Sequence, residues 1–354
     1  MPPCCATDAC GCLGDSALPV EVKHYDALDA VERDAAGLLD RAARASLYER
    51  LGWFRLVADH CPPPGRLLVL RARDGEAEAW LFLAIDKGQA AAFACWYSLA
   101  FGAIRAGPDA PHLLTALARA LRRYPGVALA SLYPLHAGDP LVAAFRRAGW
   151  LVRAEPPSVS WRIATFGMNF AAYWAGRPSK LRNTAERKAK AAKLDIAIHR
   201  DFDAAAWADY EAVYAQSWKP EEGSPAFLRA LAEAEGAAGT LRLGVAYQQG
   251  APLAAQLWLV EDGVATIHKL AYAEGAKKLS PGTVLSREMF RHVLDVDHVR
   301  AIDFGLGGDA YKADWMEESQ PVLRLEAFNP RRPMGIYRFA RATASALVRG
   351  ARSR

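Results

Sequence analysis

Two polar side chains that could take part in a reaction interrupt an apolar stretch, IHKLAY, at residues 267–272. Neighbouring side chains in a strand alternate between faces, so His268 and Leu270 are expected on one face and Lys269 on the other. A neutral histidine titrates near neutral pH and can accept a proton from an amine. The alternative is a half-buried histidine with a structural hydrogen-bond partner, and the strand alone leaves both open.

A short basic loop, residues 277–283, follows this strand and opens a predicted helix. Free N–H groups and the positive end of the helix dipole make a helix start suited to phosphate. Gly282 would let the backbone approach an anion closely, and Lys277 and Lys278 add positive charge. A plain strand-to-helix connection would look similar, so phosphate binding is a hypothesis at this point.

A third polar cluster lies in IDFGLGGDAYKADW, residues 302–315, where three glycines stand at a predicted strand end. Loops in such places often form sites, and the alternative is a glycine-rich turn with solvated charges. The spacing Gly-x-Gly-Gly excludes a dinucleotide fingerprint, and the sequence has no Gly-Lys-Ser/Thr of a P-loop. No residues show metal-ligand spacing, so no metal is expected. The polar and aromatic members of the cluster are Asp303, Asp309, Tyr311, Lys312 and Trp315.

Composition indicates a globular protein of about two domains, with 354 residues, 52% hydrophobic and 23% charged. The net charge of +5 favours an anionic ligand without demanding nucleic acid. The N-terminus lacks a secretion signal, which predicts a cytoplasmic location. Residues 88–104 are short and partly polar for a membrane helix, so no membrane insertion is expected. Four clustered cysteines, Cys4, Cys5, Cys10 and Cys12, match no zinc pattern and are expected to be reduced thiols in a frayed tail.

The order of predicted elements repeats after about 180 residues, which indicates domain duplication. AWLFLAIDKGQAAAFACWY in the first half resembles AQLWLVEDGVATIHKLAY in the second, each with two apolar strands around an acidic turn. The expected strands are 20–25, 67–73, 77–86, 90–97 and 127–133, then 241–248, 252–260, 264–272 and 299–304. The expected helices are a helical region over 27–60, then 111–124, 140–148, one after Pro178, and 283–294.

These motifs, in this order, resemble a known family. The strand, the loop with Ser280-Pro281-Gly282, the helix, the next strand and DFG..GD.YK..W resemble the CelD-like (cellulose-biosynthesis-type) branch of the GNAT acetyltransferase superfamily. W..RPSKLRNT..RK, at residues 174–188, resembles the stretch before that family's catalytic half. The likeness covers residues 161–315 well and the N-terminal half more loosely. The related Fem-type peptidoglycan transferases share the double-GNAT architecture.

The resemblance implies an α/β (α+β) fold of two tandem GNAT-like domains, each with a mixed twisted sheet flanked by helices. The expected division is a disordered tail (1–18), an N-terminal GNAT-like domain (19–160), a basic linker and helix (161–194) and a catalytic GNAT domain (195–345). The first copy lacks a counterpart of the Ser-Pro-Gly loop and of the His-Lys pair. We therefore expect that it does not bind CoA and instead completes the acceptor pocket.

The resemblance also implies transfer of an acyl group, expected to be acetyl, from acyl-CoA to an amine. The acceptor would be a small polar molecule, a sugar or an amino acid, in envelope or polysaccharide biosynthesis. The amine would attack the thioester directly, with a backbone N–H near Leu270 binding the carbonyl oxygen. His268 or Asp303 would act as base, and Tyr272 or Tyr311 would protonate the thiolate. Lys277, Lys278, Ser280, Gly282 and Thr283 would bind CoA, and Lys269, Asp309, Lys312 and Trp315 the acceptor.

Two other functions stay open. The first is an aminoacyl-tRNA-dependent transferase of the Fem type, in which the basic stretch would contact tRNA phosphates. A solvated helix or a clamp on CoA phosphates explains the same stretch, and no long heptad segment for a helical arm follows. The second is a non-catalytic GNAT-fold scaffold. The basic residues are Arg177, Lys180, Arg182, Arg187, Lys188, Lys190 and Lys193.

Overall fold

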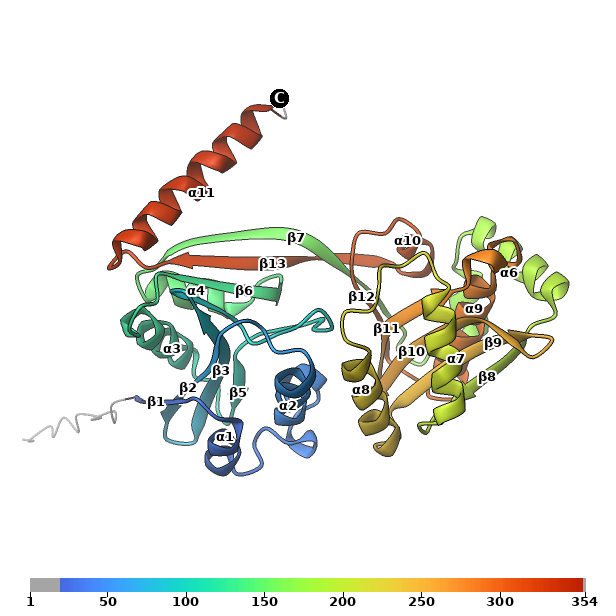
Figure 1. The fold of residues 1–354 in the computed structure, drawn as a ribbon, viewed down its shortest axis with the longest axis horizontal. Helices are drawn as coiled ribbons and strands as arrows, with labels where there is room; N and C mark the ends of the chain where they lie inside the picture. The colour runs from blue at the N-terminus through green and yellow to red at the C-terminus, as the bar shows by residue number, and fades with distance from the viewer. Residues whose placement is uncertain (1–19, 353–354) are drawn as a thin grey trace, which may run out of the picture.

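One mixed sheet runs through residues 20–352, the part of the chain that this computed structural model describes. Its strand order is β1-β2-β3-β4-β6-β13-β7-β12-β11-β10-β9-β8, and β5 pairs with β3 (Figure 1). The tail expected at residues 1–18, with its four cysteines, lies outside the described residues. The strands are β1 (Glu21–Tyr25), β2 (Arg66–Asp74), β3 (Ala77–Asp86), β4 (Gln89–Ala92), β5 (Ile104–Ala106), β6 (Leu129–His136), β7 (Leu151–Ala164), β8 (Asp195–His199), β9 (Leu241–Gln248), β10 (Ala251–Glu261), β11 (Val264–Tyr272), β12 (Ala301–Leu306) and β13 (Glu318–Phe328).

The two halves of the sheet repeat one pairing pattern. In the first half, β1 to β4 pair antiparallel in chain order, and β4 then pairs in parallel with β6. In the second half, β8 to β11 pair antiparallel in chain order, and β11 then pairs in parallel with β12. The repeat confirms the expected fold of two tandem copies, each with a mixed sheet and helices.

Two long strands that the sequence did not predict join the copies into one sheet. β7 pairs with β13 along most of its length and with β12 at its end. β13 lies between β6 and β7, so the chain returns to the first half after completing β12. Apolar alternation is weak in β7, which carries Pro156 and Pro157 in an exposed stretch, and this explains why its sequence does not read as a strand.

The helices predicted from the sequence are present in the predicted order, and the structure adds five that were not predicted, at residues 170–175, 204–215, 225–237, 312–315 and 333–352. The helical region expected over 27–60 is two helices with 3-10 turns between them, because Ala36 and Gly37 adopt left-handed backbone conformations that end the first. The strand expected over 90–97 ends at Ala92, and the residues after it form a turn. The α-helices are α1 (Leu28–Ala35), α2 (Leu51–His60), α3 (Pro111–Arg123), α4 (Pro140–Arg147), α5 (Phe170–Ala175), α6 (Ser179–Ala192), α7 (Ala204–Ala215), α8 (Pro225–Ala237), α9 (Pro281–Asp295), α10 (Lys312–Trp315) and α11 (Pro333–Arg352).

The two copies share a hydrophobic core. Helix α2 of the first copy packs against α8 of the second, where the Trp53 and Phe227 rings meet edge to face at 5.3 Å. Aromatic pairs of this kind contribute about 0.5–1.5 kcal/mol beyond their buried area. An ion pair of 2.5 Å between Arg50 and Glu261 also joins the copies. These contacts fix the relative position of the residues that each copy brings to the site.

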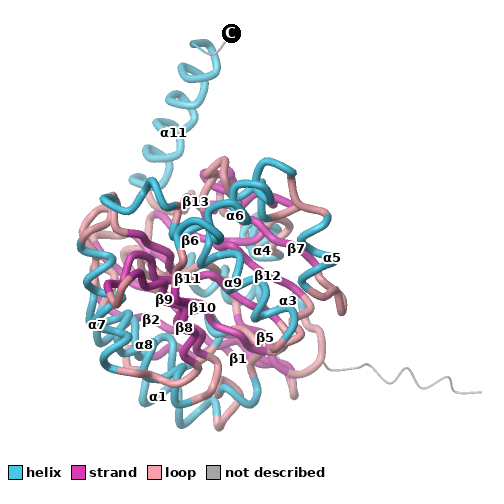
Figure 2. The backbone as a smooth tube through the Cα atoms, turned by 90° about the vertical axis from the view of Figure 1, so that its right-hand side faces the viewer, coloured by secondary structure: helices cyan, strands magenta, loops and turns pink. Residues whose placement is uncertain are grey.

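Helix α11 stands clear of the rest of the chain in two perpendicular views (Figures 1 and 2). Its second turn contacts the sheet, where the Phe339 ring packs edge to face on Phe328 of β13. Within residues 20–352, no helix is long and apolar enough to cross a membrane.

Candidate functional site

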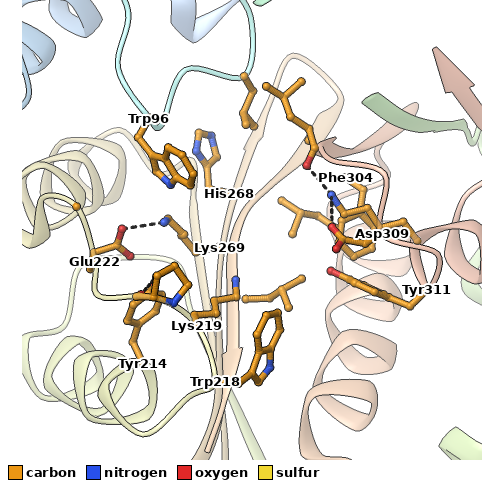
Figure 3. Close-up of a pocket in the computed structure, with 18 of the residues that line it drawn as sticks. Trp96, Tyr214, Trp218, Lys219, Glu222, His268, Lys269, Phe304, Asp309 and Tyr311 are labelled. Carbon is orange, nitrogen blue, oxygen red and sulfur yellow. Dashed lines mark hydrogen bonds and ion pairs between the residues drawn. The ribbon is translucent and has the colours of Figure 1, made fainter. Parts of the chain in front are cut away.

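A cavity of about 550 Å³ opens where β11 and β12 separate. The two strands pair in parallel only from Val264 to Thr266 and from Ala301 to Asp303, and beyond these residues they diverge. The ends of both strands, the loop before α8 and the loop before α10 line the cavity (Figure 3). The first copy supplies Trp96 and Leu99 to the same cavity.

A β-bulge at His268 sets the direction of the polar side chains on β11. Lys269 pairs with Leu257 and Ile267 pairs with Trp258, so His268 is an extra residue without a partner in β10. The expected alternation of faces is therefore wrong at this point. His268, Lys269 and Leu270 all line the cavity.

The His268 ring is partly buried and neutral. Burial, and next the nearby Lys269 ammonium, lower the pKa of His268 from 6.5 to about 4. Its Nε2 lies 3.5 Å from the Tyr48 hydroxyl of the first copy, and burial raises the pKa of Tyr48, which keeps its proton. His268 can thus accept a hydrogen bond or a proton at neutral pH, but it is a weak base in this environment.

Lys269 is held by groups from both copies. Its Nζ lies 2.8 Å from Glu222 Oε1, and both side chains are at least nine-tenths buried. The Tyr97 hydroxyl of the first copy donates to the same oxygen at 2.7 Å. The ammonium also lies 4.7 Å from the Tyr97 ring centre and 5.6 Å from that of Tyr214, within range of cation–π attraction. These contacts hold the Lys269 ammonium in one position beside the diverging strands.

Lys219 is a second cation at this site, on the loop between α7 and α8. Burial, and next the charge of Lys269, lower the pKa of Lys219 to about 8, while Glu222 acts in the opposite direction. A lysine with this pKa has a substantial neutral fraction near pH 8. It can therefore exchange a proton with a ligand in the cavity.

The loop after β12 forms the opposite wall. Lys312 Nζ donates to the Leu306 carbonyl at 2.7 Å and lies 3.6 Å from Asp309. Burial lowers the pKa of Lys312. The Tyr311 ring packs edge to face on Phe304, and burial raises the pKa of Tyr311, which keeps its proton. The three residues predicted here, Asp309, Tyr311 and Lys312, therefore do line the cavity.

Three predicted site residues have other positions. Asp303 accepts a hydrogen bond from the Gly305 backbone N–H at 2.7 Å and lies outside the cavity lining, so it shapes the turn after β12. Tyr272 packs against the start of α9, and a Cβ on Gly282 would lie 3.2 Å from its ring. Trp315 is buried and stacks on Phe290 at 4.9 Å, which places it in the core instead of in contact with an acceptor.

The predicted anion loop is positioned beside helix α6. Lys277 and Lys278 are exposed, and Lys188 of α6 donates a hydrogen bond to the Lys278 carbonyl. Ser280 has a left-handed backbone and begins α9 without a side-chain cap, and its carbonyl accepts from the Thr283 N–H. The Tyr272 ring packs so close to Gly282 that a side chain there would contact it, and this close packing accounts for the glycine. Anion binding by the exposed lysines and the helix start stays a prediction.

Several site residues, in the first copy and in the α7–α8 loop, were not predicted from the sequence. Tyr48, Tyr97 and Trp96 reach the site only through the pairing of the two copies. The segment SWKPEEGSP, residues 217–225, contains Lys219 and Glu222, and its density of charge, proline and an aromatic residue before a helix could have marked it as a site loop. Among residues 20–352, no group of His, Cys, Asp and Glu is arranged to hold a metal ion.

Residues 178–313 match the family model described as "Acetyltransferase (GNAT) domain". These residues are therefore similar to that family. The match contains both diverging strands, the predicted anion loop and the α7–α8 loop, so all second-copy residues of the cavity lie within the matched residues. No curated protein matches the chain.

Several solved structures of low identity have similar folds. FemX matches with a TM-score of 0.54 and 11% identity, over 78% of this chain and 95% of FemX. A tandem GNAT protein from the clavulanic acid biosynthesis pathway matches with 0.50 and 15%, over 87% of this chain and 98% of its own. The C-terminal domain of a putative lysylphosphatidylglycerol synthetase from Agrobacterium fabrum matches with 0.53 and 15%, over 74% and 83%. At these identities the likeness establishes the fold alone, and the match to the family model lies in the second copy.

Proposed function

We propose that the protein transfers an acyl group from an acyl-CoA thioester to an amine, in the cavity between β11 and β12. The observation that carries the proposal is the divergence of these parallel strands beyond Thr266 and Asp303 within the residues that match the GNAT family model. A divided strand pair gives an extended donor a slot with unpaired backbone groups on both sides. The motif DFG..GD.YK..W at its end supports membership of the CelD-like branch.

The donor would lie along the slot with its phosphates toward the start of α9. Lys277 and Lys278 are exposed there, and α6 brings Lys188 to the same place through its bond to the Lys278 carbonyl. Positive side chains and a helix start both favour phosphate. This arrangement supports a role for the basic helix in binding the donor.

The thioester carbonyl would lie against the bulged part of β11. A backbone N–H near Leu270 would stabilise the oxygen as negative charge develops on it. The attacking amine must lose a proton, and Lys219 is better suited to accept it than His268, because a pKa of about 8 lies nearer neutrality than one of about 4. Tyr311 keeps its proton and would donate it to the departing thiolate.

The first copy would close the acceptor side of the cavity. Trp96 and Leu99 form part of the wall, and the Tyr97 hydroxyl holds Glu222 in place. The cavity continues into a hollow of about 570 Å³ at the ends of β4 and β6, the matching parallel pair of the first copy. This second hollow would give the acceptor an approach separate from that of the donor.

Aminoacyl-tRNA-dependent transfer is the second candidate. Its support is the likeness to FemX and the exposed basic residues Lys180, Arg187 and Lys190 on α6. Arg177 does not belong to this surface, because its side chain is buried and pairs with Glu317 at 2.5 Å. The basic surface is therefore smaller than the sequence indicated, and it lies beside the predicted CoA phosphates.

Thermal stability separates these functions. Acetyl-CoA at one hundred times its dissociation constant should stabilise the protein by about 2.7 kcal/mol. The double variant Lys277→Glu, Lys278→Glu should lose this stabilisation, and Lys23→Glu, an exposed lysine of β1, is the control. Stabilisation by charged tRNA alone would support the Fem-type function, and stabilisation by neither donor would support a non-catalytic scaffold.

A further inference from the structure

The hollow of about 570 Å³ beside the reaction cavity is lined by residues of both copies. It opens where β4 and β6 separate, because these parallel strands pair only over residues 89–91 and 129–131. Trp96, Lys219 and Lys269 line the hollow and the reaction cavity alike (Figure 3). Trp96 is 80% exposed, so the two spaces meet along an open edge and one ligand can lie in both.

The two spaces differ in charge. Among the described residues, three acidic side chains line the reaction cavity and none lines the hollow. The basic residues of the hollow are Lys219, Lys269 and Arg324. Glu222 pairs with Lys269 at 2.8 Å, and Lys219 loses its proton from about pH 8. Arg324 keeps its charge throughout this range, so the hollow is positive and favours an anion.

Two features hold Arg324 at the wall of the hollow. Strand β13 has a register shift between Leu323 and Leu325 in its pairing with β6. In its pairing with β7 the register shifts between Val322 and Arg324. Such irregularities redirect a side chain out of the normal alternation. The guanidinium lies 4.8 Å from the ring centre of Tyr133 on β6, within the range of cation–π attraction.

The N–H groups of Arg324 are open to a ligand. The side chain is exposed and forms no hydrogen bond or ion pair with any residue of the described part, 20–352. Glu155, which faces it in the β7 register, pairs with Arg153 instead. A guanidinium has a planar fork of donors that matches a carboxylate or a phosphate. Ser131, also on the lining, can add a hydroxyl donor.

We propose that the acceptor of the transfer is an amine that also carries an anionic group, a carboxylate or a phosphate, which Arg324 binds in the hollow. Its amine would lie in the reaction cavity near Lys219, where Glu221 and Asp309 attract positive charge. The amine nitrogen bonds to the acyl carbon as the carbon–sulfur bond breaks. The amine proton passes to Lys219, the thiolate takes the proton of Tyr311, and the anionic group is unchanged. The acceptor class rests on the proposed function, whereas binding of an anion by Arg324 does not.

Matched acceptors test the proposal. The panel consists of ω-amino acids of two to six carbons, aminoalkyl phosphates of the same chain lengths, and n-alkylamines of the same numbers of carbons, each with a set of acyl-CoA donors. The preferred anionic acceptor should exceed its matched alkylamine about tenfold or more in kcat/KM, mainly through KM. Preference for the carboxylate or for the phosphate identifies the anionic group. An alkylamine acylated as fast as every anionic acceptor would overturn the proposal.

Variants of Arg324 show whether this residue recognises the anion. Arg324→Gln should reduce the preference for the anionic acceptor about tenfold, and Arg324→Lys should retain part of it, because the charge remains without the fork. Arg123→Gln, which replaces an exposed arginine of α3, is the control and should keep the full preference. Equal losses for anionic and neutral acceptors in Arg324→Gln would give Arg324 a role in donor binding or in structure, and would overturn the proposal.

Calorimetry with the same panel, in the absence of an acyl donor, separates this inference from the proposed function. If an ω-amino acid or aminoalkyl phosphate binds and Arg324→Gln weakens the binding about tenfold, but no amine is acylated, the anion site stands and the transfer is overturned. If amines are acylated and Arg324→Gln alters neither their binding nor the preference among them, the transfer stands and the anion site is overturned. Absence of both binding and acylation across the panel would overturn both.

Discussion

The lowered pKa of His268 gives a prediction that depends directly on the geometry of the site. Folding moves the pKa of this histidine from 6.5 to about 4, because the ring is buried and Lys269 is its neighbour. Between these values the unfolded chain binds a proton that the folded chain does not. Stability therefore falls as the pH falls through this range, and it is unaffected by His268 well above pH 6.5.

The size of the effect follows from the two pKa values. Lowering the pH from 7 to 5 should remove about 1.5–2 kcal/mol of unfolding free energy through His268 alone, with the lower figure allowing for the part of the ring that water reaches. His268→Gln has no titrating group and can still face the Tyr48 hydroxyl, which lies 3.5 Å from Nε2 in the wild type. The variant should thus gain about 1.5–2 kcal/mol relative to the wild type over this pH change.

Urea unfolding of both proteins at pH 7 and pH 5 measures this difference. Carboxylates present in both proteins contribute equally to their pH dependence, so their contribution cancels. His136→Gln, which replaces an exposed histidine of β6, is the control. The assignment of His268 as a buried neutral ring would be refuted if the difference in unfolding free energy between wild type and His268→Gln changed by less than about 0.5 kcal/mol between pH 7 and pH 5. Histidine ring signals in NMR give the same pKa directly.

Three further predictions follow from the site and the joint between the copies. If Lys219 accepts the proton, kcat/KM should rise as the pH passes through about 8, and Lys219→Met should be at least 100-fold slower with no such rise in a pH profile. Tyr311→Phe should lower kcat about tenfold or more while leaving KM for the acyl donor nearly unchanged, as measured by thiol release. Arg50→Ala should lower the free energy of unfolding by about 3 kcal/mol, because it removes a buried guanidinium that pairs with Glu261 and donates to the Arg44 and Ala45 carbonyls. Arg229→Ala, in an exposed helical pair, should lower it by at most about 0.5 kcal/mol, and urea unfolding measures both.

The repeat of elements was predictable because its central strands, such as β3 and β9, are nearly continuous apolar runs that are buried along most of their length. β9 and β11 begin and end at the residues that the sequence predicts. The two strands that line the cavity and the loop after β12 were predictable for the same reason, since glycines and polar residues follow apolar runs, whereas their divergence is seen only in the strand pairing. The strands β7 and β13 were not, because long exposed stretches with proline lack the alternation that marks a strand.

The site was predictable only in part. His268 and Lys269 stand out because they are polar within an apolar strand, but the bulge that turns both into the cavity depends on pairing with β10. Glu222 and Tyr97 have no local signal, because their roles arise from a contact between residues 125 positions apart in the chain. Asp303 has the residue type of a base, yet its hydrogen bond to Gly305 gives it a structural role.

The central claim is that an acyl group passes from acyl-CoA to an amine in the cavity between β11 and β12. The most direct measurement combines thiol release from a panel of acyl-CoA donors and amines with mass spectrometry of the product. The account predicts one N-acylated amine for each thiol released, and a rate at least 100-fold lower in Lys219→Met. An N-acylated product formed only from aminoacyl-tRNA, with no thiol released from any acyl-CoA, would contradict it.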